Sequence, residues 1–452
     1  MESHLLYHNG DSPPLVIDMF HRNKLNGWID FKRLKCTVSE LKYFLTHFHS
    51  DHYGGIGKTW SNTIYTSHIT GTLVEKVLGV NPKYICKLQL NRVYKLCNFT
   101  FSFVGANHCP GSVMIIFEFV SGKRILHTGD FRYHNTILKS LNIQAPDTTC
   151  DLSDVDLLFL TDYESDDSNH DTELKLVDKT ATLIDANVIF DIVLMDTTFS
   201  LIKGVFPTQD VVIAQVIEDV SNHLKECSGK CLFLFGSYLL GKERLYFSVA
   251  HKFAMPIVFA NQKQHKIITS LPLKSKYFSL ISNTHDINGN DITNGVTGII
   301  HIVSLHLLGT VYPRFIPNMK WIENYLTEVN NNTASCAEFD RVVAYLPTGW
   351  AHKFHMKSNQ YKNVYATSVS YSEHSSASEI EQFVSVLKPR QIIPSVYSNQ
   401  NEREQILLMY SKYTKHNNHS KSAKNEVIKN EGGTVKTVKR MRQQVLDEFY
   451  AK

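Results

Sequence analysis

Residues 45–56, "LTHFHSDHYGGI", place His47, His49, Asp51 and His52 within six positions. The residues just before the histidines, "YFLT", are apolar and β-prone, which predicts a strand that ends there. In an extended chain the side chains of His47 and His49 point to the same side. The turn-forming residues that follow can bend the chain and bring Asp51 and His52 to the same region. Because imidazole and carboxylate groups bind zinc and two ions can share such a cluster, this stretch predicts a metal site rather than four surface residues.

Three later stretches offer further ligands for such a site. "GANHCPGSVMIIFE" places His108 in a turn before a strand, and "RILHTGDFR" places Asp130 just after one, where it could bridge two metals. "YSEHSSASEIE" puts His374 among serines at a predicted helix start, a position that also suits a phosphate group. A single histidine or aspartate is more often structural, but in order after the first motif the three support one another.

Composition and charge place the chain among ordinary globular proteins. It has 452 residues, 43% of them hydrophobic and 20% charged, with a formal net charge of +4. Residues 401–452 carry eleven Lys or Arg against six Asp or Glu, so the rest of the chain is close to neutral. This basic end favours a polyanion nearby or a solvated, flexible terminus. The eight cysteines show no disulfide spacing, and Cys227 and Cys231 lack the second pair that a zinc site of their own would need.

The pattern of strands and helices indicates a β-rich domain that is interrupted by an α/β unit. Short β-type runs dominate the first 135 residues, and helices are predicted near residues 67–79, 208–226, 241–253 and 375–389. Residues 161–186 carry eight acids and two lysines, which is typical of a solvated surface insertion. No apolar run is long enough to cross a membrane, and no secretory signal is recognised at the N-terminus, so we expect neither.

Taken in order, these motifs make the chain resemble the metallo-β-lactamase-fold nucleases with a β-CASP insertion, and most of all the DNA interstrand cross-link repair exonucleases related to Artemis and Apollo. The resemblance covers roughly residues 13–410. Its segments are the metal motifs above together with "VIDMF" (16–20), "LMDTTF" (194–199), "FPTQ" (206–209), "GSYLLGKER" (236–244) and "PTGW" (347–350).

The resemblance implies an α/β fold, a four-layer αββα sandwich with an inserted α/β domain. The first part of the metallo-β-lactamase domain would span residues 1–200, including the acidic insertion at 161–186. The β-CASP domain would span 201–345. The second part of the metallo-β-lactamase domain would span 346–410, followed by a basic, flexible tail at 411–452.

The resemblance also implies a role for each site residue. The metal ligands would be His47, His49, Asp51, His52, His108, Asp130 and His374, holding one tight Zn²⁺ and a second metal, Zn²⁺ or Mg²⁺. Catalysis would rest on Asp51, His52, Asp130 and His374. Asp18 and Asp196 would orient the ligand histidines through hydrogen bonds; Asp162 also follows a similar strand, but it lacks the "DTT" and "FPTQ" context. Ser372, Ser375 and Lys242 would bind the substrate phosphate.

The activity that the resemblance implies is a zinc-dependent DNA 5′-to-3′ exonuclease that requires a 5′-phosphate, acts in the nucleus in cross-link repair, and cleaves by metal-hydroxide attack on the phosphodiester. Val396 stands where RNA-processing members have histidine, which favours DNA. A structure-selective DNA endonuclease remains the main alternative, followed by an RNA-processing nuclease and a small-ester or β-lactam hydrolase. The expected partner is single-stranded or damaged duplex DNA with 5′-phosphate ends; a monomer is expected, and the protein partners are left open.

Overall fold

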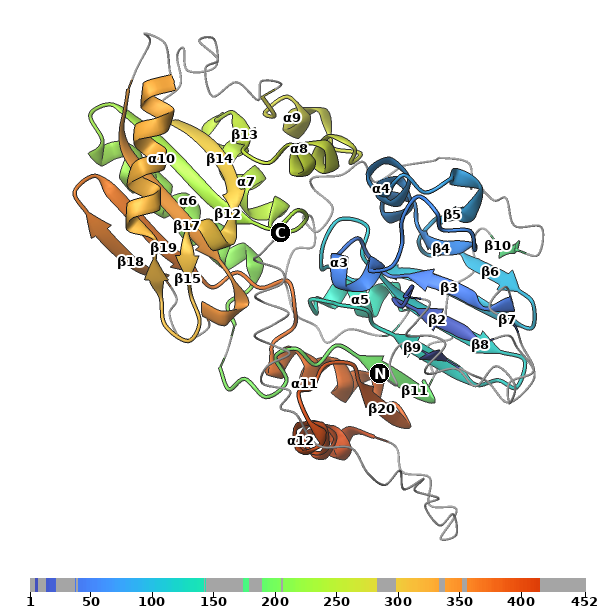
Figure 1. The fold of residues 1–452 in the computed structure, drawn as a ribbon. Coiled ribbons are helices and arrows are strands. Elements are labelled where there is room, and N and C mark those ends of the chain that lie inside the picture. Colours follow the sequence, from blue (N-terminus) through green and yellow to red (C-terminus); the bar gives the residue numbers. More distant parts are fainter. Residues whose placement is uncertain are drawn as a thin grey trace, which may run out of the picture.

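The fold is described from a computed structural model (Figure 1). The structure describes residues 5–6, 14–21, 37, 40–141, 143, 174–178, 189–204, 206–282, 298–332, 338–351 and 356–414. The expected tail lies outside these residues from 415 onwards, as does the acidic insertion except for 174–178. Within the described part of the chain, no helix has the length and apolar character that a membrane crossing requires.

The first sheet has five strands in the order β1-β2-β3-β4-β5. These are β1 (Leu5–Leu6), β2 (Leu15–Ile17), β3 (Lys42–Leu45), β4 (Ile64–Ser67) and β5 (Ile85–Leu88). Strands β2 to β5 are parallel, and β1 runs antiparallel to β2. Parallel strands are covered on both faces, and the apolar residues of β3 accordingly alternate between two cores.

The second sheet has seven strands in the order β10-β6-β7-β8-β9-β11-β20. These are β10 (Lys175–Asp178), β6 (Val93–Leu96), β7 (Phe99–Gly105), β8 (Val113–Phe119), β9 (Arg124–His127), β11 (Ile192–Met195) and β20 (Gln391–Pro394). Strands β6 to β9 form an antiparallel meander and β10 runs antiparallel to β6, whereas β9, β11 and β20 are parallel. The last strand therefore returns to this sheet after an excursion of almost 200 residues.

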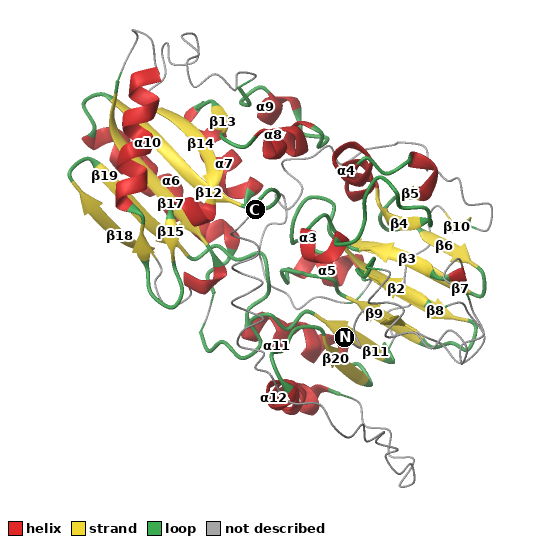
Figure 2. Ribbon diagram, in the orientation of Figure 1, coloured by secondary structure: helices red, strands yellow, loops and turns green. Residues whose placement is uncertain are grey.

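These two sheets pack face to face. Phe44 and Tyr65 of the first sheet meet Phe101 and Phe117 of the second in a shared aromatic core. Helix α4 (His68–Leu78) covers the outer face of the first sheet. The outer face of the second is covered by α5 (Asn135–Ser140), α11 (Ala377–Leu387) and α12 (Gln400–Tyr410), the last followed by η6 (Ser411–Tyr413). This arrangement, visible in Figure 2, confirms the expected αββα sandwich.

A third sheet forms the core of a second unit beside the sandwich (Figure 1). Its six strands, in spatial order, are β13 (Ile257–Phe259), β14 (Gly298–Ser304), β12 (Lys230–Ser237), β17 (Phe339–Pro347), β19 (Val364–Val369) and β18 (Met356–Tyr361). All neighbours are parallel except β18 and β19. The two-stranded sheet of β15 (Gly309–Thr310) and β16 (Ile316–Pro317) lies apart from it.

Helices surround the third sheet and connect it to the sandwich. They are α6 (Gln209–Glu226), α7 (Glu243–Phe253), α8 (Gln262–Thr269), α9 (Ser275–Phe278), α10 (Met319–Asn332) and the 3₁₀ turns η4 (Leu305–Leu307) and η5 (Gly349–Ala351). Helix α8 contacts α4 of the sandwich, and the apolar side chains at this junction belong to one continuous core. Short elements α3 (Ser50–Tyr53) and η3 (Pro82–Tyr84) complete the sandwich.

The expected boundary at residue 345 does not coincide with a change of sheet. Strand β17 crosses it, and β18 and β19 continue the third sheet to Val369. The expected bounds place these two strands in the sandwich, but a sequence pattern that predicts a strand carries no information about which sheet the strand joins. We propose that the inserted unit runs from about residue 201 to 370.

Candidate metal centre

Most of the predicted site residues lie just past the ends of strands, and their side chains meet at one edge of the sandwich, where His49 contacts Leu240 of the second unit. Asp18, His47, Asp130 and Asp196 follow β2, β3, β9 and β11, His108 lies in the β7–β8 connection, and His374 precedes α11. Parallel strands place their carboxyl ends at the same edge, which explains why residues so far apart in sequence converge.

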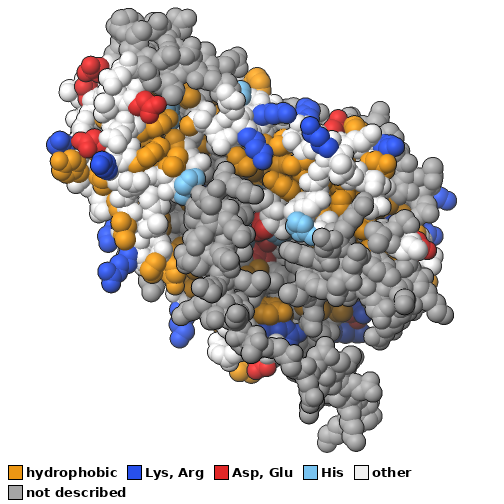
Figure 3. Space-filling model, in the orientation of Figure 1, with side chains coloured by type: hydrophobic (Ala, Val, Ile, Leu, Met, Phe, Trp, Pro, Cys, Tyr) orange, Lys and Arg blue, Asp and Glu red, His pale blue; other side chains and the backbone are white. Residues whose placement is uncertain are grey.

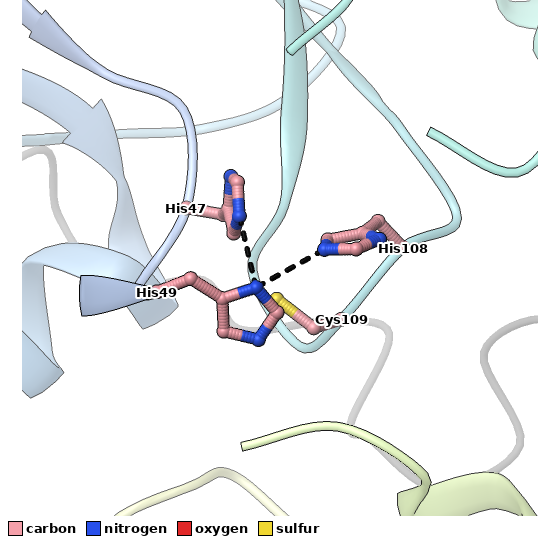
Figure 4. Close-up of side chains that lie close together, drawn as sticks. All are labelled: His47, His49, His108 and Cys109. Carbon is pink, nitrogen blue, oxygen red and sulfur yellow. Dashed lines mark hydrogen bonds between the residues drawn. The ribbon is translucent and has the colours of Figure 1, made fainter. Parts of the chain in front are cut away.

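The rings of His47, His49 and His108 point toward one another (Figure 4). Nδ1 of His49 lies 3.1 Å from Nε2 of His47 and 3.1 Å from Nε2 of His108. In a tetrahedral zinc site with Zn–N bonds of about 2.0–2.1 Å, ligand nitrogens stand roughly 3.3 Å apart. The spacing of the three nitrogens therefore fits one zinc ion.

The neighbours of these three rings determine which nitrogen carries the proton. His108 donates from Nδ1 to the Glu373 carbonyl at 2.8 Å, and His49 donates from Nε2 to the Leu240 carbonyl at 3.1 Å. The Thr46 hydroxyl donates to Asp18 and so accepts from Nδ1 of His47 at 2.9 Å. Each ring consequently presents its unprotonated nitrogen to the other two, and three converging lone pairs repel one another unless a cation lies between them.

The electrostatics keep the three rings neutral, as metal ligands must be. Burial, more than any other cause, lowers the pKa of His108 to about 3, lowers that of His47 well below its usual value and lowers that of His49. The residues present therefore fit a resident divalent metal ion, and three nitrogen ligands with an adjacent carboxylate suit zinc.

The Cys109 thiol lies beside the same cluster (Figure 4), and its sulfur is within 4.8 Å of the ligand atoms of all three histidines. The sequence reasoning had not considered it as a ligand. Burial, followed by the nearby Glu373 and Glu243 carboxylates, raises the pKa of this thiol well above its usual value. A protonated thiol is a poor ligand, so the three histidines are the better ligand set.

Asp130 occupies the middle of the site. Its Oδ2 lies 3.3 Å from Nε2 of His52, 3.7 Å from Nε2 of His108, 3.8 Å from Nε2 of His47 and 4.0 Å from Nε2 of His374. Burial raises the pKa of this carboxyl, but the surrounding histidines, His52 foremost, bring it well below the usual value. Asp130 is therefore ionised and lies among four histidine rings, and the bridging role expected of it stays a prediction.

Two further aspartates, Asp18 and Asp196, each orient one of the two remaining histidines through a hydrogen bond to its ring. Asp18 accepts from Nδ1 of His52 at 2.8 Å, and Asp196 accepts from Nδ1 of His374 at 2.8 Å. Both carboxylates are buried, so each ring turns its Nε2 toward Asp130. Burial alone would lower the pKa of His374, but Asp196 and Asp130 raise it to about 9. The orienting roles expected of Asp18 and Asp196 agree with these contacts.

Asp51 lies at the rim of the site. It stands in the first turn of α3, its side chain is 66% exposed, and its Oδ2 is 3.7 Å from Nε2 of His52. This carboxylate is the part of the cluster most open to solvent. Its position suits contact with a water molecule or with substrate.

Ser372 and Ser375 are buried and take part in hydrogen bonds within the protein. The Ser372 hydroxyl donates to the His374 carbonyl at 2.7 Å, and the Ser375 hydroxyl donates to the Phe131 carbonyl at 2.9 Å. These hydroxyls hold the loop that carries His374. The phosphate contacts expected of them stay predictions that this geometry disfavours.

Lys242 is not a surface lysine. It is buried, and its Nζ donates to Glu373 Oε2 at 2.6 Å while its backbone N–H donates to Glu373 Oε1 at 2.6 Å. A lysine paired in this way has a structural role at the site, so its expected role as a phosphate contact is likewise disfavoured.

Several residues that shape the site were not singled out from the sequence. Arg132 is buried and donates to the carbonyls of Ser372 and His374 and to the Glu379 carboxylate. Thr46 joins Asp18 to His47, as described above. Both residues stand inside the quoted motifs, but only their three-dimensional contacts reveal what they do.

A comparison with protein-family models matches residues 292–400 to the family described as DNA repair metallo-beta-lactamase. The match includes His374 and the strands that lead to it, and a search of characterised proteins returns DNA repair proteins over most of the chain. These findings confirm the resemblance to the metallo-β-lactamase DNA repair nucleases.

Three relatives illustrate this resemblance. "DNA ligase 6" of Arabidopsis thaliana is 29% identical over 82% of this chain and 22% of its own length. "DNA cross-link repair protein SNM1" of Arabidopsis thaliana is 29% identical over 84% of this chain and 66% of its own length. "5' exonuclease Apollo" of Mus musculus is 27% identical over 82% of this chain and 53% of its own length. The chain thus spans less than two thirds of each of these relatives.

A solved structure of a protein of unknown function from Enterococcus faecalis V583 aligns over 86% of this chain and 89% of that chain. Its TM-score is 0.48 and its sequence identity is 11%. A likeness this weak has no bearing on fold or function.

Proposed function

We propose that this protein is a zinc-dependent DNA nuclease, a 5′-to-3′ exonuclease that requires a 5′-phosphate and acts in the repair of DNA interstrand cross-links. The observation that carries the proposal is the convergence of three neutral imidazoles beside the ionised Asp130, with Nδ1 of His49 lying 3.1 Å from Nε2 of His47 and 3.1 Å from Nε2 of His108. Such a site suits hydrolysis of a phosphodiester, whose transition state gathers negative charge.

Zinc is the metal that this ligand set favours, with His47, His49, His108 and Asp130 holding the first ion. His52 and His374, each held by its own aspartate, would hold a second ion together with Asp130 and Asp51. When bound, zinc supplies a Lewis acid that lowers the pKa of water toward about 7 and withdraws charge from a phosphoryl oxygen.

The side chains themselves position the reacting groups. Asp18 and Asp196 keep the protons of His52 and His374 on Nδ1, so the Nε2 atoms face the site. Asp51, exposed at the rim, is placed to accept a hydrogen bond from the attacking water and orient it toward phosphorus.

Basic side chains outside the centre support a polyanionic substrate. Lysine and arginine side chains gather where α8 and α9 meet α4 (Figure 3). Exposed lysines of these elements are Lys76, Lys263, Lys266 and Lys276. Contacts of this kind hold the phosphate backbone without reading sequence, so binding should weaken as salt rises.

DNA rather than RNA is proposed as the substrate on two grounds. The relatives include proteins named for DNA cross-link repair and a 5′ exonuclease. Val396, where the resemblance places histidine in RNA-processing members, lies close to the site: its backbone N–H donates to the hydroxyl of Thr197, the residue after Asp196, at 3.1 Å. A role in cross-link repair also leads us to propose that the protein acts in the nucleus.

The test is a timed digestion of single-stranded DNA that carries a 3′ label and either a 5′-phosphate or a 5′-hydroxyl. Matched RNA and an Asp51→Ala variant purified in the same way serve as controls. Stepwise shortening from the 5′-phosphate end, lost in the variant, is the expected result. Internal cuts at hairpins or junctions regardless of the 5′ end would support the endonuclease instead, and cleavage of RNA alone would overturn the choice of DNA.

A further inference from the structure

A row of aromatic rings runs from His374 to the surface of the second unit. The Phe199 ring lies edge-on to the His374 ring, with centroids 6.0 Å apart. Trp350 lies edge-on to Phe199 at 5.1 Å, and Tyr312 is tilted against Trp350 at 5.0 Å. The row therefore leads from His374 in the proposed metal centre to Tyr312, which lies outside that centre.

The row brings together the last residues of two motifs, and the metal chemistry explains neither aromatic ring. Phe199 ends "LMDTTF", and Trp350 ends "PTGW". Gly349 allows this meeting, because a Cβ atom there would lie 2.7 Å from the Phe199 ring and 2.9 Å from the Ser372 hydroxyl oxygen. Any side chain at this position would push Trp350 away from the loop that carries His374.

The two ends of the row differ in their surroundings. Phe199 is buried, whereas Trp350 is only partly buried and Tyr312 is 61% exposed. Tyr312 lies between β15 and β16, and the exposed Arg314 follows two residues later. Among the residues that the structure describes, Arg314 has no acidic partner. The outer end thus combines exposed ring surface with an uncompensated positive charge.

We propose that Tyr312 and Trp350 form a stacking surface for unpaired bases of the strand whose phosphate lies at the metal centre, with Arg314 contacting the backbone of that strand. This inference rests on the proposed nuclease function. It adds an explanation of how the protein holds an unpaired strand. Aromatic rings next to a basic group are the means by which proteins hold single strands without reading sequence, since every base has a stacking face. A paired base, already stacked in a duplex, cannot use this surface.

The first measurement is binding of an oligothymidylate to the Asp51→Asn protein, which should leave the oligonucleotide intact. Stacking on Trp350 should quench part of the tryptophan fluorescence, and Trp350→Phe should remove that part of the change. Tyr312→Ala and Trp350→Ala should each raise Kd by about 5- to 100-fold, while Tyr312→Phe and Trp350→Phe should stay near the parent value. Tyr361→Ala, which removes an exposed tyrosine from β18, is the matched control and should bind normally.

The second measurement compares this oligomer with one of the same length that has no bases. The parent should bind the base-free oligomer more weakly, and the two alanine variants should lose that preference. Arg314→Ala should weaken both oligomers and reduce the salt dependence of log K by about one unit of slope. Equal binding of both oligomers by the parent, or parent-like binding by both alanine variants, would overturn the stacking surface. A Tyr312 surface that serves a protein partner would give this same negative result.

Failure of the stacking surface is distinguishable from failure of the nuclease. Hydrolysis of bis(p-nitrophenyl) phosphate, a phosphodiester without bases, should be unchanged in Tyr312→Ala. If the parent hydrolyses it and the variants bind DNA normally, only the stacking surface is wrong. If the parent hydrolyses neither this compound nor DNA with zinc present, the proposed nuclease function is wrong, whereas the oligonucleotide comparison still decides the stacking surface. Because Tyr312 is mostly exposed, Tyr312→Ala should fold like the parent even if a Trp350 variant does not.

Discussion

Lys242 and Glu373 form a buried ion pair that joins the inserted unit to the metal centre. The Lys242 ammonium donates to one carboxylate oxygen of Glu373 at 2.6 Å, and the Lys242 backbone N–H donates to the other at 2.6 Å. The Glu373 carbonyl accepts from His108, and the Leu240 carbonyl, two residues before Lys242, accepts from His49. The β12–α7 loop thus orients His49 directly, and it orients His108 through the Glu373 loop that Lys242 holds in place.

Replacing Lys242 with methionine should therefore weaken zinc binding. The variant loses the contact that fixes Glu373, and the His108 ring loses its fixed orientation, for which a rise in the zinc Kd of about 10- to 100-fold is expected. The measurement is a competition titration against a chromogenic chelator, together with the visible absorption spectrum of the cobalt-substituted protein, which reports ligand geometry.

Two comparisons separate this positioning role from a general loss of stability. Lys252→Met removes an exposed lysine from the same helix and should leave zinc affinity unchanged. Lys242→Met combined with Glu373→Gln removes the unpaired buried charge, so it should recover stability but not zinc affinity. If Lys242→Met binds zinc as tightly as the parent and gives the same cobalt spectrum, the ion pair does not position the ligands.

Zinc itself should stabilise the fold. The lone pairs of His47, His49 and His108 face one another at 3.1 Å, and a cation removes their repulsion. Free zinc at 100 times its Kd should add about 2.7 kcal/mol to the free energy of unfolding. Thermal melts of chelator-treated protein with and without added zinc test this. Calcium, which prefers oxygen ligands, should have little effect, and a melting temperature that zinc leaves unchanged would contradict the three-histidine site.

The sequence predicts the ligand set more completely than the substrate contacts. Several histidines and aspartates that follow strand ends have few roles in common other than metal binding. His47, His108 and Asp130 could therefore be predicted as metal ligands before any contact was known. Serines and lysines are common in many settings, and whether Ser372 or Lys242 faces substrate or protein depends on burial. The boundary expected at 345 stays a prediction that the strand pairing disfavours, because a strand pattern does not tell which strands become neighbours.

Replacement by asparagine should affect the free energy of unfolding little at the exposed Asp51 and strongly at the buried Asp18. Asp51→Asn should abolish hydrolysis yet shift the free energy of unfolding by no more than about 0.5 kcal/mol, because the side chain is 66% exposed. Asp18→Asn should cost roughly 2 kcal/mol or more, because the buried carboxylate accepts hydrogen bonds from Thr46 and His52. Urea unfolding of the metal-free proteins and a digestion assay give both quantities. Full activity in Asp51→Asn would remove the proposed role of this carboxylate.

Glu243 should make the stability of the metal-free protein depend on pH. This carboxyl is buried beside Lys242 and Glu373, and its Oε1 accepts from the Gly241 N–H at 2.7 Å. Burial, and then the charge of Glu373, raises its pKa from 4.5 to about 8. Because the folded state holds this proton more tightly than the unfolded state, the contribution of Glu243 to stability is complete below pH 4.5. It is lost as the pH rises toward 8.

A Glu243→Gln variant should lack this dependence, since its neutral amide has no proton to lose. Measured by urea unfolding, the variant should gain stability relative to the parent between pH 5 and pH 8, with a slope of at most about 1.4 kcal/mol per pH unit. Other groups that titrate in this range are common to both proteins and cancel in the difference. Glu218→Gln, an exposed change on α6, should give a curve parallel to that of the parent. A parallel curve for Glu243→Gln as well would mean that Glu243 is already ionised in the folded protein and that Lys242 is shared between two carboxylates.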